Sequence, residues 1–91
     1  MPALSGMECE DRRFVYILRS SRNSKRHYTG VTSNVAKRLE WHNAGQNTHT
    51  VNDRPWRVIV SLEFQTADAA GQFERYLKTG SGRAFAKRHF P

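Results

Sequence analysis

The sequence has little cysteine: Cys9 is the single one among 91 residues. One cysteine excludes an internal disulfide framework and a zinc site built from several cysteines. No apolar run approaches the roughly 20 residues of a membrane-spanning helix, and the N-terminus lacks the apolar stretch of a secretory signal. These absences predict a cytoplasmic protein with no membrane partner.

Acidic residues are also scarce, since 8 Asp and Glu stand against 15 Lys and Arg and leave a net charge of +7. Between Arg12 and Leu39 there are eight basic residues and no acidic one, and no acid follows Glu74. Clustered Lys and Arg neutralise phosphates and release counterions. The charge pattern therefore favours a nucleic-acid partner over a merely solvated basic surface.

The length allows one domain. Residues 1–12 hold Pro2, Gly6 and three acids without any hydrophobic period, so they are predicted to form a loosely ordered arm. Residues 13–91 are predicted to form the single domain.

Three apolar or alternating runs predict strands at 14–18, 27–32 and 55–64, with a hairpin loop at 20–26. Three helices are predicted, each after a capping residue: Ser33 or Asn34 before a helix to about Ala44, Thr66 before 67–78, and Ser81 before a helix to about Arg88. The order β-β-α-β-α-α predicts an α+β fold, a three-stranded and mainly antiparallel sheet flanked by helices. The direction of the third strand is left open.

Finer expectations follow from the same patterns. Alternation along the third strand places Val58, Val60, Leu62 and Phe64 on one face, and the helix 67–78 is expected to bury Ala69, Ala70, Phe73 and Leu77. Gly30 within a strand indicates a bulge or a close approach by another group. The polar loop 45–54 is longer than most connections, which points to function or mobility.

Five residues carry the chemistry that the pattern suggests. Arg38 and His42 are four apart and project from one helix face. Tyr16 and Tyr28 lie on adjacent strands and can share a sheet face, and Glu74 follows the apolar Phe73 on a later helix, where it can point between helix and sheet. Taken singly, each has an ordinary structural role, and Glu74 could simply pair with Lys78.

Four segments together resemble the GIY-YIG nuclease domain. Residues 14–16 (Phe-Val-Tyr) occupy the position of the family's Gly-Ile-Tyr motif, and residues 28–30 (Tyr-Thr-Gly) that of its Tyr-Ile-Gly motif. Residues 38–42 match the family's Arg-x-x-x-His helix, and Glu74 falls where its metal-binding glutamate is expected. The resemblance covers residues 14 to about 89 and is greatest to the small stand-alone bacterial members. The sequence departs from the pattern at Phe14, at Thr29 and at Ala86, where many members have an asparagine.

This resemblance implies a divalent-metal-dependent DNA endonuclease, with single-stranded or distorted DNA as the expected substrate and no organic cofactor. Tyr28 would act as general base or position the water, His42 would accept or relay a proton, and Arg38 would hold the phosphate. Glu74 would bind one Mg²⁺ or Mn²⁺ ion, and Tyr16 would orient the water. Arg83, Lys87 or the backbone N–H groups of residues 80–82 could replace the missing asparagine.

Other basic and aromatic residues are expected to contact the nucleic acid: Arg19, Arg26, Lys37, Trp41, Lys78, Arg83 and Lys87. Two other functions remain open at this point, a non-catalytic nucleic-acid-binding module of the same fold and an RNA nuclease. The sequence also leaves open the oligomeric state, the choice between Mg²⁺ and Mn²⁺, and any sequence preference.

Overall fold

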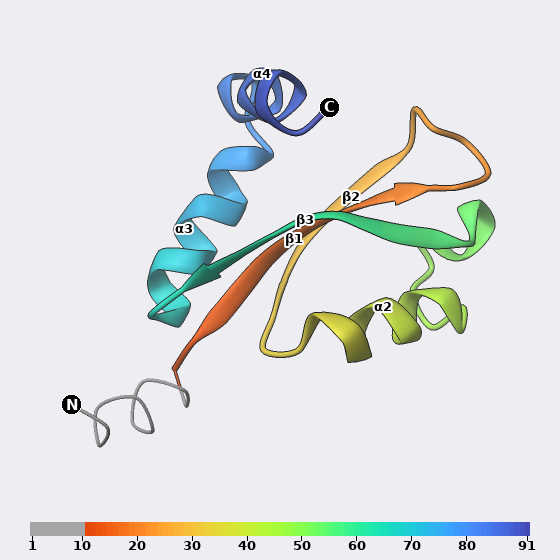
Figure 1. The fold of residues 1–91 in the computed structure, drawn as a ribbon, viewed down its shortest axis with the longest axis horizontal. Helices are drawn as coiled ribbons and strands as arrows, with labels where there is room; N and C mark the ends of the chain where they lie inside the picture. Colours follow the sequence, from red (N-terminus) through yellow and green to blue (C-terminus); the bar gives the residue numbers. More distant parts are fainter. Residues whose placement is uncertain (1–10) are drawn as a thin grey trace.

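The structure is a computed structural model and describes residues 11–91 (Figure 1). The predicted arm therefore lies outside the described residues except for Asp11 and Arg12. Arg12 pairs with Glu63 of the third strand at 3.2 Å, and its guanidinium lies over the ring of Phe14.

Within residues 11–91, six main elements follow in the predicted order β-β-α-β-α-α. They are β1 (Arg13–Ser20), β2 (His27–Thr32), α2 (Val35–Asn43), β3 (Trp56–Phe64), α3 (Ala67–Leu77) and α4 (Gly80–His89). A short 3₁₀ turn, η1 (Val51–Asp53), lies within the loop before β3.

The three strands form one sheet in the order β2-β1-β3, and both neighbours of β1 run antiparallel to it. This confirms the predicted α+β fold and settles the direction of the third strand. Both faces of the central strand β1 are covered, because helices pack on both sides of the sheet: Val15 and Ile17 face one core cluster, and Tyr16 and Leu18 face the other. That position explains why the strand reads as a continuous apolar run.

Helices lie on both sides of the sheet (Figure 1). The first core cluster joins Val15 and Ile17 to α3 through Ala70 and Leu77 and to α4 through Phe85 and other apolar residues. The second joins Tyr16 and Leu18 to α2 through Val35 and Leu39. Within residues 11–91, no helix has both the length and the apolar character needed to cross a membrane.

A β-bulge in β3 overturns the prediction that Val58 and Val60 share a face. The pairing register moves from Ile17–Val60 to Leu18–Val58, so Ile59 is an extra residue between them. Val58 consequently packs in the cluster under α2, while Ile59 and Val60 pack in the cluster under α3. A single extra residue reverses the alternation of every position beyond it.

The helix ends follow side-chain caps, two of which were predicted. The side chain of Asn34, rather than Ser33, accepts from the N–H of Lys37, and Thr66 caps α3 as expected. The cap of α4 is Thr79, whose hydroxyl accepts from the N–H of Gly82, so the prediction of Ser81 was wrong. The predicted break between α3 and α4 is shorter than the sequence suggested, because the cap follows α3 almost directly.

The buried stripe of α3 is confirmed at Ala70 and Leu77, which are buried, and at Phe73, which is partly buried and packs on the core. Ala69 is exposed, contrary to the prediction. It lies in the first turn, where its N–H donates to the hydroxyl of Thr66.

Candidate functional site

Tyr16, at the middle of β1, lies against Gly30 of β2. The two residues are directly paired in the register, and Tyr16 is 1% exposed. A Cβ atom added to Gly30 would lie 2.5 Å from the Tyr16 hydroxyl oxygen. Of the two interpretations of Gly30, the structure supports the close approach: a side chain there would occupy the space of the Tyr16 ring.

The Tyr16 hydroxyl is hydrogen-bonded to His42 of α2. Its oxygen lies 3.0 Å from Nε2 of His42, and the other ring nitrogen, Nδ1, lies 3.0 Å from the hydroxyl of Thr50. The Thr50 hydroxyl donates to the carbonyl of Asn47, so it accepts from Nδ1–H. This network assigns Nε2 as the acceptor of the Tyr16 proton.

Burial keeps both members of this pair uncharged. Desolvation raises the pKa of Tyr16 to about 12; Tyr28 and Glu74 act in the same direction, and Arg38 opposes them by its charge and a hydrogen bond. Burial, followed by the Arg38 charge, lowers the pKa of His42. At neutral pH the site therefore holds a neutral phenol that donates to a neutral imidazole.

Tyr28 and Arg38 complete the cluster around this pair. The Tyr28 ring lies 4.7 Å from the His42 ring and 6.4 Å from the Tyr16 ring, measured between centroids. Arg38 precedes His42 by one helical turn, and its guanidinium carbon lies 5.0 Å from the Trp41 ring. Tyr16, Tyr28, Arg38 and His42 therefore meet on the α2 side of the sheet.

Glu74 approaches from α3. Its carboxylate affects the pKa of Tyr16, which places its charge within electrostatic range of the tyrosine. The side chain is 18% exposed and forms an ion pair with Lys78, one turn later. The ordinary helix pair considered from the sequence is thus present, and it shows that the carboxylate accepts a cation.

In the part of the chain that the structure describes, Glu74 has few neighbours that could also bind a metal ion, so an ion there would have few protein ligands. Among residues 11–91, no group of three or more His, Cys, Asp and Glu side chains is placed to bind a metal. Mg²⁺ and Mn²⁺ prefer oxygen ligands, and Mg²⁺ retains several waters, so one carboxylate is a sufficient protein ligand. The carboxylate of Glu74 is such an oxygen ligand, and in the structure it is paired with Lys78.

The remaining predicted contacts fall into two groups. Arg19, Lys78, Arg83 and Lys87 line one groove between the β1–β2 hairpin and α4. The others lie elsewhere: Arg26 pairs with Asp53 at 3.2 Å, and Lys37 and Trp41 are exposed on α2.

Ala86, at the position of the missing asparagine, is partly buried and packs against the core. Its methyl group supplies no polar contact. Arg83 and Lys87, which precede and follow it on α4, both line the groove and remain the candidates for that contact.

Sequence reasoning missed the role of Thr50, which it left within the long polar loop 45–54 without a role of its own. Thr50 is fully buried, holds His42 through its hydroxyl, and accepts from the indole N–H of Trp56 through its carbonyl at 2.7 Å. The side chain of Asn43 holds the backbone of Trp56 at both N–H and C=O. The only available signal was a threonine eight residues after the histidine, in a loop without periodicity.

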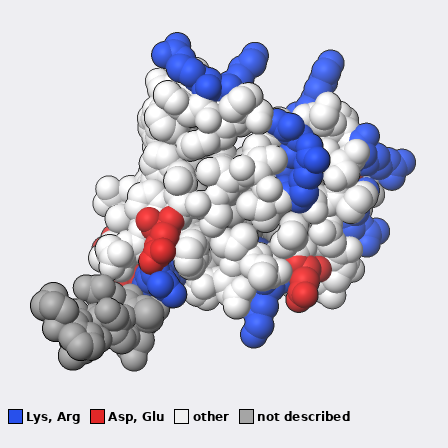
Figure 2. Space-filling view, viewed as in Figure 1, with Lys and Arg blue, Asp and Glu red and all other residues white. Residues whose placement is uncertain are grey.

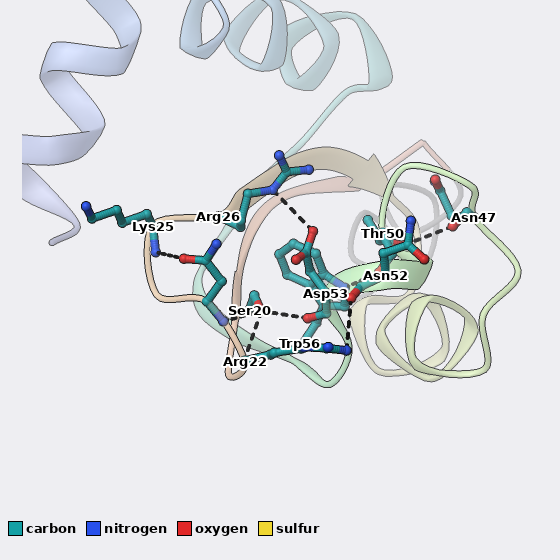
Figure 3. A network of polar contacts seen from close by, with 10 residues as sticks. Ser20, Arg22, Lys25, Arg26, Asn47, Thr50, Asn52, Asp53 and Trp56 are labelled. Atoms are coloured by element: carbon teal, nitrogen blue, oxygen red, sulfur yellow. Dashed lines mark hydrogen bonds and ion pairs between the residues drawn. The ribbon is translucent and has the colours of Figure 1, made fainter.

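The same loop is tied to the β1–β2 hairpin (Figure 3). The Ser20 hydroxyl donates to the carbonyl of Asp53 at 2.6 Å, and the Asp53 carboxylate pairs with Arg26. Arg22 donates to the carbonyl of Asn52. These bonds order residues 50–53, so the segment that supports His42 is fixed to the sheet.

Replacing Thr50 by Val is expected to destabilise the protein by about 1–3 kcal/mol, because it leaves Nδ1 of the buried His42 without a partner. Urea denaturation monitored by Trp fluorescence measures the change. Thr50→Ser keeps the hydroxyl and is expected to lose less. Equal losses for Val and Ser would contradict the hydrogen-bond explanation and assign the effect to packing alone.

Comparison with known proteins agrees with this geometry. Residues 12–88 match the GIY-YIG catalytic domain, so the chain belongs to the GIY-YIG family and has its nuclease-type fold. UPF0213 protein SH2523 from Staphylococcus haemolyticus (strain JCSC1435) is 35% identical over 71 residues, which cover 77% of this chain and 84% of that protein. The resemblance seen in the sequence is thereby confirmed, and the family implies a nucleic-acid substrate.

Proposed function

We propose that this protein is a divalent-metal-dependent DNA endonuclease that hydrolyses phosphodiester bonds, with a preference for single-stranded or distorted DNA. One observation carries the proposal. A buried Tyr16–His42 hydrogen bond is surrounded by Tyr28, Arg38 and the charge of Glu74, although these residues come from four elements.

Phosphodiester hydrolysis needs an oriented water, neutralisation of the phosphate and stabilisation of the leaving oxygen. The guanidinium of Arg38 is planar and permanently charged, and it can bind two phosphate oxygens at once. The Arg38 guanidinium lies over the ring of Trp41, which is an exposed side chain. Arg38 thus supplies the positive charge that the transition state requires.

The two tyrosines have different parts in this proposal. Tyr16 is buried, has a pKa of about 12 and already donates to His42, so it orients the imidazole and does not act as a base. Tyr28 is only partly buried, and its ring lies against the same imidazole. Tyr28 is therefore the residue that positions the attacking water.

Glu74 would hold the metal ion, Mg²⁺ or Mn²⁺. The ion would take the place that Lys78 now occupies at the carboxylate. When bound, such an ion supplies Lewis-acid stabilisation of the leaving oxygen. Both ions suit an oxygen ligand, and the nucleic-acid phosphate and water can complete the coordination.

The proposal is tested with end-labelled single-stranded DNA, duplex DNA and RNA of one sequence. Each is incubated at low salt with Mg²⁺, Mn²⁺ or a chelator. We expect cleavage of DNA only with metal, and faster cleavage of the single strand. Binding without cleavage in every reaction would favour the non-catalytic module, and cleavage of RNA alone would favour the RNA nuclease.

A further inference from the structure

Both nitrogens of the His42 imidazole are occupied by buried partners. The side chain is fully buried, with Nε2 3.0 Å from the Tyr16 hydroxyl and Nδ1 3.0 Å from the Thr50 hydroxyl. The rings of Tyr28 and Trp41 lie beside it, at 4.7 and 5.0 Å between centroids. A water or a phosphate could therefore reach either nitrogen only by breaking a buried hydrogen bond. The part that His42 plays is set by its two hydroxyl partners.

The direction of these hydrogen bonds is fixed at the two ends of the chain. A hydroxyl can donate or accept, so neither partner of His42 decides by itself which nitrogen carries the proton. Beyond Thr50 lies the carbonyl of Asn47, 3.4 Å from the hydroxyl, which can only accept. Beyond Tyr16 lies the guanidinium of Arg38, which is hydrogen-bonded to the phenol and can only donate. Both ends require the same direction, from Arg38 towards Asn47.

This direction places the single proton of the neutral imidazole on Nδ1. Thr50 then accepts from Nδ1–H, and Nε2 is left to accept from Tyr16. A histidine side chain free in water favours the opposite tautomer, with the proton on Nε2. Within a protein, the tautomer is selected by the hydrogen bond that the other ring nitrogen makes. For His42, that bond is the one to Thr50.

The Thr50 hydroxyl is itself held by a closed circuit of hydrogen bonds. Its residue is fully buried, and its carbonyl accepts from the indole N–H of Trp56 at 2.7 Å (Figure 3). The backbone N–H and C=O of Trp56 are both bonded to the side chain of Asn43. Asn43 follows His42 directly in α2. The helix that carries the imidazole therefore also fixes the group that selects its tautomer.

We propose that Thr50 is a positioning residue, whose hydroxyl holds His42 in the Nδ1–H tautomer and thereby directs the Tyr16 proton to Nε2. The inference rests on the proposed nuclease function and assigns His42 to orienting the phenol rather than to exchanging protons with water. In the opposite tautomer, Nε2–H would donate to Tyr16. The phenol proton would then lose its buried acceptor and lie beside Arg38, the residue proposed to bind the phosphate.

The tautomer is measured directly, without metal or nucleic acid. Long-range proton–nitrogen NMR spectra distinguish the ring nitrogen that carries a proton from the one that does not. His42 is buried, whereas the other three histidines, His27, His49 and His89, are exposed and are expected to exchange between tautomers. Wild type and Thr50→Ser are expected to show the proton of His42 on Nδ1, and Thr50→Val to show it on Nε2. A proton on Nε2 in wild type would overturn the proposal.

Cleavage shows what the tautomer does. In single-turnover reactions with metal, Thr50→Val is expected to cut at least about tenfold more slowly than wild type, since a histidine held in the wrong tautomer no longer orients its partner. Thr50→Ser is expected to restore most of the rate. Binding of uncut DNA in chelator is expected to stay unchanged, because it depends on Lys and Arg side chains that project from the surface (Figure 2), whereas Thr50 is buried. Cleavage by Thr50→Val at the wild-type rate would overturn the proposal.

Thr32→Val is the matched control for lost stability. Thr32 is also a buried threonine, 7% exposed, and its hydroxyl is bonded to the N–H and C=O of Asn34. Its substitution removes a buried hydroxyl of the same kind and is expected to leave the tautomer of His42 and the cleavage rate unchanged. An equal loss of rate in Thr32→Val and Thr50→Val would assign the effect to stability alone and refute the positioning role.

The outcomes separate this inference from the proposed function, because the spectra require neither metal nor DNA. A proton on Nδ1 that depends on the Thr50 hydroxyl, with no cleavage by wild type, would refute the nuclease and retain the hold of Thr50 on His42. Metal-dependent cleavage by a wild-type protein whose His42 carries its proton on Nε2 would refute the inference and retain the nuclease. The wild-type spectrum decides the tautomer even if Thr50→Val fails to fold.

Discussion

Glu74→Gln is expected to lower the rate of DNA cleavage by at least about a hundredfold, because an amide cannot hold a divalent ion as a carboxylate does. Binding of uncut single-stranded DNA in chelator is expected to remain or to become tighter. The reason is that the substitution frees Lys78, which lines the groove, from its ion pair with Glu74. Single-turnover cleavage and anisotropy on the same preparations measure the two effects.

Glu63→Gln is the matched control for this experiment. Glu63 is also a glutamate in an ion pair, with Arg12, but it lies on β3 and its side chain is 43% exposed. Its substitution is expected to leave cleavage within about twofold of wild type. Cleavage by Glu74→Gln at the wild-type rate would show that Glu74 is not the metal ligand.

Gly82→Ala is expected to cause the largest loss of stability. A Cβ atom at this position of α4 would lie 1.8 Å from the carbonyl oxygen of Tyr76 and 2.6 Å from Cα of Leu77. Both are backbone atoms of α3, so neither can move without shifting the helix. Overpacking against backbone atoms is expected to lower the free energy of unfolding by about 3 kcal/mol. In a domain of this size, that loss lowers Tm by about 10 °C or more.

The neighbouring glycine of the same helix provides the comparison. A Cβ added to Gly80 meets no atom within 4 Å. Gly80→Ala is therefore expected to leave Tm unchanged or to raise it slightly, since alanine loses less backbone entropy on folding. Thermal melts by circular dichroism measure both variants, and equal melting temperatures would contradict the close packing of α3 against α4.

Local patterns in the sequence were sufficient for most of the fold. The order of elements, the caps at Asn34 and Thr66 and the face of α3 that holds Leu77 follow from short-range rules of capping and periodicity. The bulge at Ile59 could not be predicted in the same way, because it depends on how β3 pairs with β1 rather than on its own residues. The assignment of Ser81 as a cap failed because capping preference ranks serine above threonine, whereas the packing of the folded chain starts the helix after Thr79.

In the candidate site, too, residues placed by local spacing could be predicted, whereas residues placed by tertiary contacts could not. Spacing placed Arg38 and His42 on one helix face, and the structure brings Tyr16 to His42 as a direct hydrogen bond. The partner of the other imidazole nitrogen, Thr50, comes from a loop whose path is set by tertiary contacts with Trp56. No local rule identifies such a residue, since its role is defined by burial that only the folded chain creates.

The two sides of the groove differ in how they are held. The hairpin is tied down by directional bonds, from Ser20 and Arg26 to Asp53. The helix α4 and the residue after it are held through apolar contacts of Phe85, Ala86 and Phe90, which are non-directional. The position of α4 therefore depends on how closely these side chains fit the sheet, whereas the position of the hairpin is fixed by individual polar bonds to residue 53.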